Sequence, residues 1–351
     1  MKIKKKYLQT IIDIFPDIIV ERSPESHKGT FGNAVIFGGA AGMGGAIALS
    51  TVAAQLMGCG KTYGVFAQDN LPVPFLHNYP EIMLRGLAQI DTLPTASAVA
   101  VGCGLGTDNR ARNVFLHALK LAAGCPIVVD ADALNLMAFN DFAVVSLENY
   151  EGEKVLTPHI GEAARLLKCE TAYVQQHQRE CATKLAETFK AWVVLKSNKT
   201  VIASHSGNLY INETGNAGLA TAGTGDVLTG MITGFLAQRM KTEVALSAAV
   251  WLHGAAAECL GEKMPLAGLL AGEIAPVART LRHQAMLYAE REVKDVPLIE
   301  KAQKLAILSD PDNFNKTETT EINNEASVTE EKPEEKEPSN SFETMEIAPN
   351  N

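Results

Sequence analysis

The stretch from residue 33 to residue 58, NAVIFGGAAGMGGAIALSTVAAQLMG, decides the fold class of this chain. Its first part, NAVIFGG at residues 33–39, is a short apolar run that ends in glycine, which predicts a buried strand followed by a loop. Its last part, IALSTVAAQLMG at residues 47–58, returns an apolar residue every three or four positions, which predicts a helix. A strand, a glycine loop and a helix in this order begin a βαβ unit.

The same order of strand and loop recurs along the chain. Further predicted strands are TYGVFA (62–67), ASAVAVGCG (96–104), PIVVDADAL (126–134), EKVLTPH (153–159) and AWVVLKSN (191–198). Predicted helices between them include ARNVFLHALKLAAG (111–124) and GEAARLLK (161–168). This alternation indicates an α/β fold with a mainly parallel central sheet, whose ligands bind at the carboxyl ends of the strands. The loops that carry motifs all follow those strands.

The chain becomes mostly helical after residue 223 and changes character again near residue 305. Helices are predicted over 226–240, 243–261 and, interrupted by glycine, 266–286. Beyond about residue 305 Asn, Thr, Glu, Pro and Ser dominate, which predicts a disordered acidic tail over 305–351. We interpret this tail as a solubilising appendage, with a regulatory or partner-binding role as the alternative.

The charge of the chain argues against nucleic acid as a ligand. The net charge is −9, but the segment from Ser309 to Asn351 alone holds 12 acidic residues and three lysines. The remaining 308 residues therefore carry 28 basic and 28 acidic side chains, with no general positive field. The lysines of MKIKKK at residues 1–6 are interpreted as a frayed, solvated terminus.

Cysteine spacing and hydropathy indicate a cytoplasmic protein. None of the six cysteines is separated from another by only two residues, so neither a zinc knuckle nor a redox dithiol is suggested. They are expected to be reduced core residues. No signal peptide is expected before Phe31, and the apolar stretches are broken by glycine and polar residues, so no membrane span is expected either.

Two glycine motifs imitate nucleotide-binding loops without meeting their requirements. GCGKT at 58–62 lacks the first glycine of a P-loop, because Gln55 stands five positions before Gly60. GCGLG at 102–106 has the spacing GxGxG, and no acidic residue follows about 20 positions later. Both loops could still line a ligand through their backbone amides.

GNAGLATAGTGDVLTG, at residues 215–230, is the most informative motif. Glycines and small side chains leave backbone amides uncovered just before a predicted helix, and such an amino end binds anions. Asp226 lies at the same helix start, where a phosphate would also lie. A plain N-cap is the simpler explanation of Asp226, but a cap does not require a loop without side chains. The motif therefore predicts a phosphate site with Asp226 as catalytic base.

Six motifs in order resemble the ADP/ATP-dependent NAD(P)H-hydrate dehydratases. They are KGTFGNAVIFGGAAGMGGAIALSTVAAQLMGCG (28–60), VGCGLG (101–106), PIVVDADALNLMA (126–138), VLTPHIGEAARLL (155–167), WVVLKSNKTVIA (192–203) and GNAGLATAGTGDVLTGMITGFLAQ (215–238). The resemblance covers about residues 28–282 and implies a ribokinase-like, three-layer α/β/α sandwich. It also implies an N-terminal extension over 1–27 and one domain over 28–300.

The resemblance implies a metabolite-repair reaction. The family removes water from the S epimer of NADH or NADPH hydrated on the nicotinamide ring, using ADP or ATP. The nucleotide phosphorylates the ring hydroxyl, and phosphate then leaves. It further implies Mg²⁺ held by phosphate oxygens and water, without a protein metal cage. A homo-oligomer, expected to be a tetramer by analogy with bacterial relatives, and a separate epimerase protein are also implied.

The family's ligand contacts carry over to individual positions of this sequence. Those expected to touch the hydrated nicotinamide nucleotide are Ala46, Gly106, His159 and Asp226. Those expected to touch the adenine nucleotide are Lys196, Ser197, Asn198, Lys199, Thr200 and Gly225. Secondary candidates are Gly104, Asp130, Asp132, Asn135, Asn216 and Gly223.

Simpler explanations exist for several of these residues. His159 could be a loop hydrogen-bonder, Lys196 a solvated strand end, and Asp130 and Asp132 caps of the following helix. The chain also departs from the family pattern at Cys103, Ile160 and Ser197, none of which is a proposed catalytic group. Two other functions remain open: a ribokinase-like kinase of a small alcohol or vitamin precursor, and a non-catalytic nucleotide-binding regulator.

Overall fold

A single central sheet of nine strands contains the strands predicted along the chain. The computed structural model describes residues 3–295, so the predicted tail over 305–351 lies outside the described residues. The strand order is β3-β2-β1-β4-β5-β6-β7-β8-β9. The strands are β1 (Asn33–Gly38), β2 (Lys61–Phe66), β3 (Met83–Arg85), β4 (Ala98–Val101), β5 (Ile127–Val129), β6 (Lys154–Leu156), β7 (Trp192–Leu195), β8 (Val201–Ala203) and β9 (Leu209–Ile211). Every pairing from β3 to β7 is parallel, whereas β8 pairs antiparallel with both β7 and β9.

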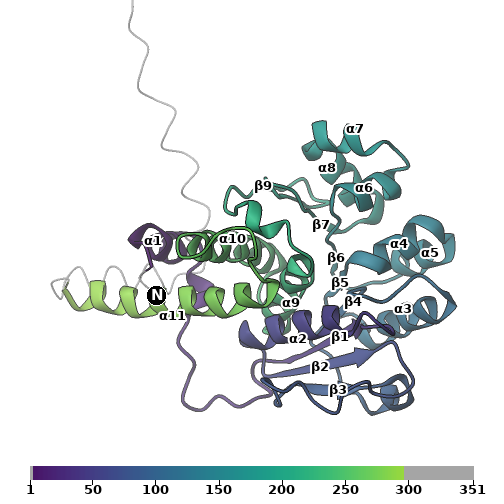
Figure 1. The fold of residues 1–351 in the computed structure, drawn as a ribbon, viewed down its shortest axis with the longest axis horizontal. Helices are drawn as coiled ribbons and strands as arrows, with labels where there is room; N and C mark the ends of the chain where they lie inside the picture. Colours follow the sequence, from purple (N-terminus) through teal and green to yellow (C-terminus); the bar gives the residue numbers. More distant parts are fainter. Residues whose placement is uncertain (1–2, 296–351) are drawn as a thin grey trace, which may run out of the picture. The chain divides into compact units, whose positions relative to one another are not determined.

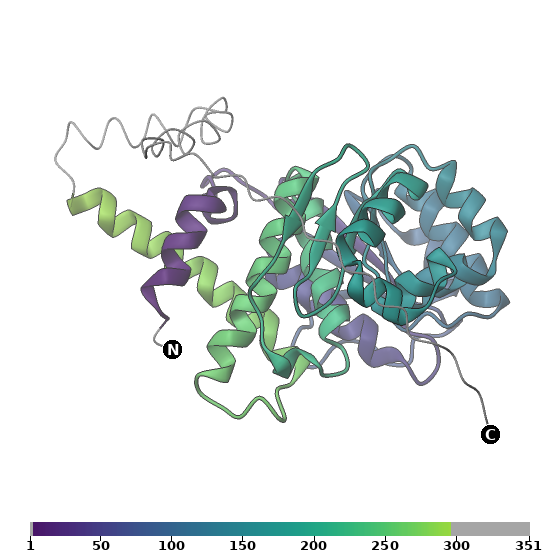
Figure 2. The same cartoon turned by 90° about the horizontal axis from the view of Figure 1, so that it is seen from above.

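Helices cover both faces of the sheet, as Figures 1 and 2 show. One layer holds α1 (Lys5–Ile14), α2 (Gly44–Leu56), α9 (Thr224–Ala237), α10 (Thr242–Gly261) and α11 (Ala271–Asp295). The other holds α3 (Asn109–Ala122), α4 (Ala131–Phe139), α5 (Asp141–Glu148), α6 (Ile160–Leu167), α7 (Thr171–Gln176) and α8 (Gln178–Phe189). Short 3₁₀ turns lie at Pro16–Ile19, Leu87–Thr92 and Ala217–Leu219. The predicted three-layer α/β/α sandwich with a mainly parallel sheet is confirmed.

Strand β1 shows why its sequence is continuously apolar. Ala34 and Ile36 belong to the core under α2 and α9, while Val35 and Phe37 belong to the core under α3 and α4. A strand covered on both faces has no solvent side, so it needs no alternation of polar residues. The same reason explains the apolar runs of β4 and β5.

Helix α9 is held close to α2 by two glycines. A Cβ atom on Gly230 would lie 2.1 Å from the Ser50 carbonyl oxygen, and one on Gly234 would lie 2.6 Å from that of Ala54. Only glycine permits so close an approach of two helix backbones. The start of α9, which carries Asp226, is thereby fixed against the helix that follows β1.

The amino end of the chain differs from the expectation of a frayed terminus. Helix α1 begins at Lys5 and buries Tyr7, Leu8 and Ile11. It packs against α11 in the same core as α9 and α10. Tyr7, Leu8 and Ile11 recur at helical spacing, and their burial outweighs the solvation of the neighbouring lysines.

One described helix would be long and apolar enough to cross a membrane. This helix is α10, and most of its apolar stretch is buried inside the protein. The core helix of a folded domain satisfies the same criteria of length and composition.

Candidate active site

The carboxyl ends of five parallel strands converge with the start of α9. The loop after β1 meets the loop after β4, because the Gly39 amide donates to the Cys103 carbonyl at 2.9 Å and that of Ala40 donates to Gly104 at 2.7 Å. The ends of β6 and β7 are joined similarly, with the Lys196 amide 2.8 Å from the Pro158 carbonyl oxygen. Ligands bind at this edge of open α/β sheets.

Asp226 lies in the first turn of α9 and does not cap it. The N-cap position is Gly223, whose φ of +90° is the left-handed region that favours glycine. A Cβ atom there would also lie 2.5 Å from Leu49. The simpler explanation of Asp226 as an N-cap is therefore wrong, and its carboxylate remains available for another partner.

The surroundings of Asp226 favour a proton acceptor that works near neutral pH. Its carboxylate, that of Asp130 and the Cys103 thiol lie within 4.8 Å of one another. Burial raises the pKa of Asp226 to about 6, and the charge of Asp130 adds to this rise. The Cys103 hydrogen bond and the Lys196 charge oppose it. A base with this pKa is ionised at pH 7 and still binds a proton readily.

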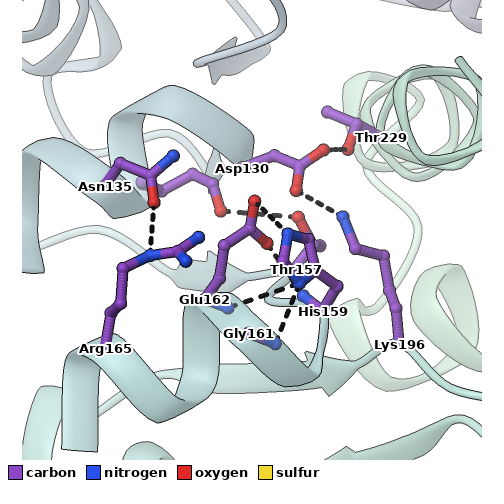
Figure 3. Close-up of polar contacts among 10 residues, drawn as sticks. Asp130, Asn135, Thr157, His159, Gly161, Glu162, Arg165, Lys196 and Thr229 are labelled. Atoms are coloured by element: carbon purple, nitrogen blue, oxygen red, sulfur yellow. Dashed lines mark hydrogen bonds and ion pairs between the residues drawn. The ribbon is translucent and has the colours of Figure 1, made fainter. Parts of the chain in front are cut away.

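Asp130 pairs with residues that lie far away in the sequence. It accepts hydrogen bonds from the Lys196 ammonium at Oδ1 and from the Thr229 hydroxyl at Oδ2, both at 2.6 Å, as Figure 3 shows. Its side chain makes no capping bond to α4. The expectation that Asp130 caps this helix is therefore wrong, and the residue instead connects β5, β7 and α9.

Lys196 is not a solvated strand end. Its side chain is 18 % exposed and forms an ion pair with Asp130. Burial alone would lower the pKa of the ammonium, but the charges of Asp130 and Glu162 outweigh burial and raise it. A Cβ atom on Gly225 would lie 3.3 Å from the Lys196 nitrogen. The glycine therefore lets a fixed positive charge lie beside the anion-binding end of α9.

The remaining predicted nucleotide contacts form the turn between β7 and β8. The Ser197 hydroxyl donates to the Gln178 side chain at 2.7 Å, and the Thr200 hydroxyl donates to the Ser197 carbonyl at 3.2 Å. Asn198 and Lys199 lie in the same turn, and Lys199 pairs with Glu213 at 3.4 Å. This turn is thus held by bonds within itself and to Gln178 and Glu213, and of the five residues 196–200 only Lys196 bonds to the group formed by Asp226, Asp130 and Cys103.

His159 caps helix α6 and lies next to Lys196. Its Nδ1 accepts from the amides of Gly161 at 3.0 Å and Glu162 at 3.3 Å, and Glu162 accepts in return from the His159 amide (Figure 3). A parallel bridge joins His159 to Lys196. The loop hydrogen-bonding explanation therefore accounts for the Nδ1 contacts, while half of the side chain stays exposed at the same edge of the sheet.

Gly104 and Gly106, two of the predicted ligand contacts, lie close to α2. A Cβ atom on Gly104 would lie 3.0 Å from that of Ala46, so these two predicted contacts are neighbours. The Gly106 amide donates to Asp132 at 2.8 Å, which gives Asp132 a role in shaping this loop. All three glycines of GCGLG have positive φ, which fixes the conformation of the loop.

The two asparagine candidates serve structural contacts. Asn135 accepts a hydrogen bond from Arg165 at 2.9 Å on the outer helices (Figure 3). Asn216 accepts from the Gly218 amide at 3.0 Å and donates to the Ala257 carbonyl at 2.7 Å, so it ties the glycine loop to α10.

The cluster around Asp226 does not fit Mg²⁺. This ion prefers six oxygen ligands, several of them water, whereas the cluster offers one thiol and two carboxylates. Asp130 is moreover occupied by Lys196 and Thr229. A magnesium ion in this region would need phosphate oxygens as its principal ligands.

One member of the cluster, Cys103, and two of its neighbours, Thr229 and His253, are not predicted from the sequence. In the sequence, Cys103 is noticeable only as a departure from the family pattern. In the structure its buried thiol lies beside Asp226. Thr229 is three residues after Asp226, so the two residues lie on one face of α9, and this spacing could have been recognised in the sequence. His253 lies on α10, where its Nε2 hydrogen-bonds the Thr224 carbonyl at 2.9 Å, and its partner could not be read from the sequence.

Comparisons with known proteins identify the family of this chain. The sequence model of the NAD(P)H-hydrate dehydratase family matches residues 34–277. The chain is 45% identical over 282 residues to the ADP-dependent (S)-NAD(P)H-hydrate dehydratase of Neisseria meningitidis serogroup B, covering 80% of this chain and 95% of the relative. It is 36% identical to the bifunctional NAD(P)H-hydrate repair enzyme of Escherichia coli, covering 72% of this chain but 48% of that protein.

A solved structure shows the same fold. The ADP/ATP-dependent NAD(P)H-hydrate dehydratase of Bacillus subtilis, co-crystallised with ATP and Mg²⁺, superposes with a TM-score of 0.66 at 33% identity. The similarity covers 76% of this chain and 94% of the other.

Proposed function

This chain belongs to the NAD(P)H-hydrate dehydratase family, and on that premise we propose its reaction and the roles of its residues. The protein is a hydro-lyase that returns the S epimer of hydrated NADH or NADPH to NADH or NADPH. ADP or ATP is consumed, and AMP or ADP is released together with phosphate.

Asp226 acts as the base of a phosphoryl transfer. The ring hydroxyl oxygen attacks the terminal phosphorus while the Asp226 carboxylate takes the hydroxyl proton. The new O–P bond forms as the bond to the nucleotide's remaining phosphate breaks. The carbon–oxygen bond then breaks, phosphate leaves with that oxygen, and the neighbouring ring carbon loses a proton. The ring double bond is thereby restored.

Charge stabilisation comes from the start of α9. Its first backbone amides and the glycine loop before it face the transferred group, and Lys196 adds a positive charge beside Gly225. The Asp226 carboxylate in the first turn of the same helix supports this proposal most directly, because one element then presents both the anion site and the base. Ala46, Gly104 and Gly106 form the wall on the substrate side.

The cofactor, assembly and location are proposed as finer points. Mg²⁺ enters with the nucleotide and is held by phosphate oxygens and water. The working enzyme is a homotetramer, which light scattering after size exclusion would test. All six cysteines are unpaired, which supports a cytoplasmic location. An epimerase activity supplies the S epimer, as suggested by the bifunctional relatives.

The decisive experiment mixes purified protein, hydrated NADH, Mg²⁺ and either ADP or ATP. Recovery of the reduced-nicotinamide absorbance, dependent on nucleotide and stoichiometric with released phosphate, is expected. The Asp226→Asn variant is the matched control and should give no recovery. An inactive wild-type protein that phosphorylates a simple alcohol would instead favour the kinase of a small alcohol or vitamin precursor, the alternative that the dehydratase relatives support less.

A further inference from the structure

Helix α1 lies outside the family match, yet it contacts α10, the helix that holds the loop leading into α9. The family match begins at residue 34, and α1 spans Lys5–Ile14. Tyr7 on this helix is 4 % exposed. Its ring contacts that of Trp251 on α10 edge-on, with centroids 6.2 Å apart. Its hydroxyl donates to Glu258 Oε2 on the same helix at 2.5 Å.

Glu258 also forms a hydrogen bond with the glycine loop. Its other carboxylate oxygen, Oε1, accepts the backbone amide of Gly215 at 2.9 Å. Gly215 is the first residue of GNAGLATAG, the glycine loop at residues 215–223, and its φ of +124° is favoured only in glycine. One carboxylate therefore connects α1 to the first amide of the loop.

Two further bonds hold the same end of the loop to α10. The Thr214 hydroxyl donates to the Trp251 carbonyl at 3.0 Å, and the Asn216 amide group donates to the Ala257 carbonyl at 2.7 Å. Among these contacts Glu258 supplies the charged acceptor. Hydrogen bonds to an ionised group are roughly twice as strong as neutral ones.

The loop needs this support because it lacks side chains of its own. Glycine-rich backbone loses much conformational entropy when it is ordered. The amides must nevertheless keep a fixed direction for a phosphate to find them arranged in advance. External contacts such as the one from Glu258 can supply that order.

We propose that Tyr7 and Glu258 are positioning residues that hold the glycine loop in the conformation that receives the nucleotide phosphates. Tyr7 orients the Glu258 carboxylate, and Glu258 fixes the Gly215 amide. Helix α1 is thereby part of the working enzyme. This inference rests on the proposed function, since it assigns the loop to the phosphates of ADP or ATP.

The chain offers a matched control for the test. Tyr210 on β9 donates to Glu243 in the first turn of α10, so it forms the same type of bond to the opposite end of the same helix. Within the described residues, the Glu243 side chain makes no hydrogen bond to the glycine loop at 215–223. Tyr7→Phe and Tyr210→Phe thus delete the same atom from a tyrosine–glutamate pair.

The measurements separate positioning from general stability. Nucleotide KM and kcat are determined for wild type, Tyr7→Phe, Tyr210→Phe and Glu258→Met, and ADP affinity is measured by calorimetry without the nicotinamide substrate. Hydrogen–deuterium exchange of peptides covering 212–223 reports the order of the loop. All measurements are made well below the melting temperature of each variant.

Tyr7→Phe is expected to raise nucleotide KM and the ADP Kd roughly threefold to tenfold, with a smaller change in kcat. Glu258→Met should have a larger effect, because the Gly215 amide loses its acceptor. Loop exchange should rise in both variants and stay at the wild-type level in Tyr210→Phe. Unchanged ADP affinity and unchanged loop exchange in Tyr7→Phe and Glu258→Met would overturn the inference. A wild-type protein that binds ADP but dehydrates nothing would instead refute the proposed function.

Discussion

Replacing Asp130 by asparagine should move the acid limb of the pH–rate profile to lower pH. The carboxylates of Asp130 and Asp226 lie within 4.8 Å of each other, and the charge of Asp130 raises the pKa of Asp226. The asparagine side chain would keep a carbonyl oxygen for Lys196 or Thr229 while removing that charge. The substitution therefore tests electrostatics with little change in shape.

The size of the effect follows from Coulomb's law. Two unit charges about 5 Å apart interact by roughly 3.5 kcal/mol at an effective dielectric constant near 20, which corresponds to about 2.5 pKa units. Asp226 is partly open to solvent, and the resulting screening reduces the shift to about 1–2 units. The pKa of Asp226, about 6 in the wild type, should fall to about 4–5.

The assay is the pH dependence of kcat/KM for the hydrated nucleotide, which reports the ionisation of the free enzyme. In the wild type the rate should fall about tenfold per pH unit below about 6, because only the ionised carboxylate accepts a proton. Asp132→Asn is the control, since the charge of Asp132 raises the same pKa but ranks last among its causes. An acid limb that stays near pH 6 in Asp130→Asn, or moves upward, would refute the reasoning.

Three further predictions concern the same cluster. Asp226→Asn should abolish turnover, leave the nucleotide Kd within about twofold and stabilise the protein by on the order of 1–3 kcal/mol at pH 7.5. The variant should be more stable because the pKa of Asp226 is raised in the folded state, so its ionisation lowers the free energy of unfolding as pH rises from about 4 through about 6. Urea titration at two pH values measures it, and a less stable variant would contradict it. Thr229→Val should lower the free energy of unfolding by about 1–3 kcal/mol, since a buried carboxylate loses a donor; an unchanged urea midpoint would count against this. Burial lowers the pKa of His253 to about 4, so its stability contribution is lost as pH falls from about 6.5 toward 4. His253→Gln should remove about 2 kcal/mol of the stability difference between pH 7.5 and pH 5, and equal pH dependence in both proteins would argue against that.

The sequence predicts those parts of the fold that depend on local pattern. The run NAVIFGG and the helix after it lie at β1 and α2, and residues 226–240 and 243–261 lie at α9 and α10. Periodicity and glycine position are properties of neighbouring residues, so they can be read without coordinates. Helix α1 is not predicted because the lysines of residues 1–6 indicate a solvated terminus, whereas the burial of Tyr7, Leu8 and Ile11 depends on α11.

The sequence predicts which residues belong to the candidate site, but not which of these side chains bond to one another. Asp226 and Gly225 can be identified because GTGD has a local chemical meaning at a helix start. For Asp130 the sequence suggests only a helix cap, which is a local contact. Its actual partners, Lys196 and Thr229, are 66 and 99 residues away and cannot be identified from neighbouring residues. Only the parallel order of β5 and β7 and the close packing of α9 bring them together.

In the proposed mechanism Asp226 is both a base and a neighbour of a phosphate, and the pairing of Asp130 with Lys196 makes the two roles compatible. A partly buried carboxylate beside a negative phosphate would tend to be protonated, and a protonated acid accepts no proton. Lys196 opposes this because its charge lowers the pKa of Asp226, and an unpaired ammonium would lower that pKa further and make the carboxylate a weaker base. Asp130 partly neutralises the Lys196 charge, because its Oδ1 lies 2.6 Å from the Lys196 Nζ, and the negative charge of Asp130 also raises the pKa of Asp226. Burial and the charge of Asp130 therefore raise the pKa of Asp226 to about 6 against the opposing charge of Lys196, and this balance requires β5, β7 and α9 to keep their relative positions when the proposed nucleotide binds.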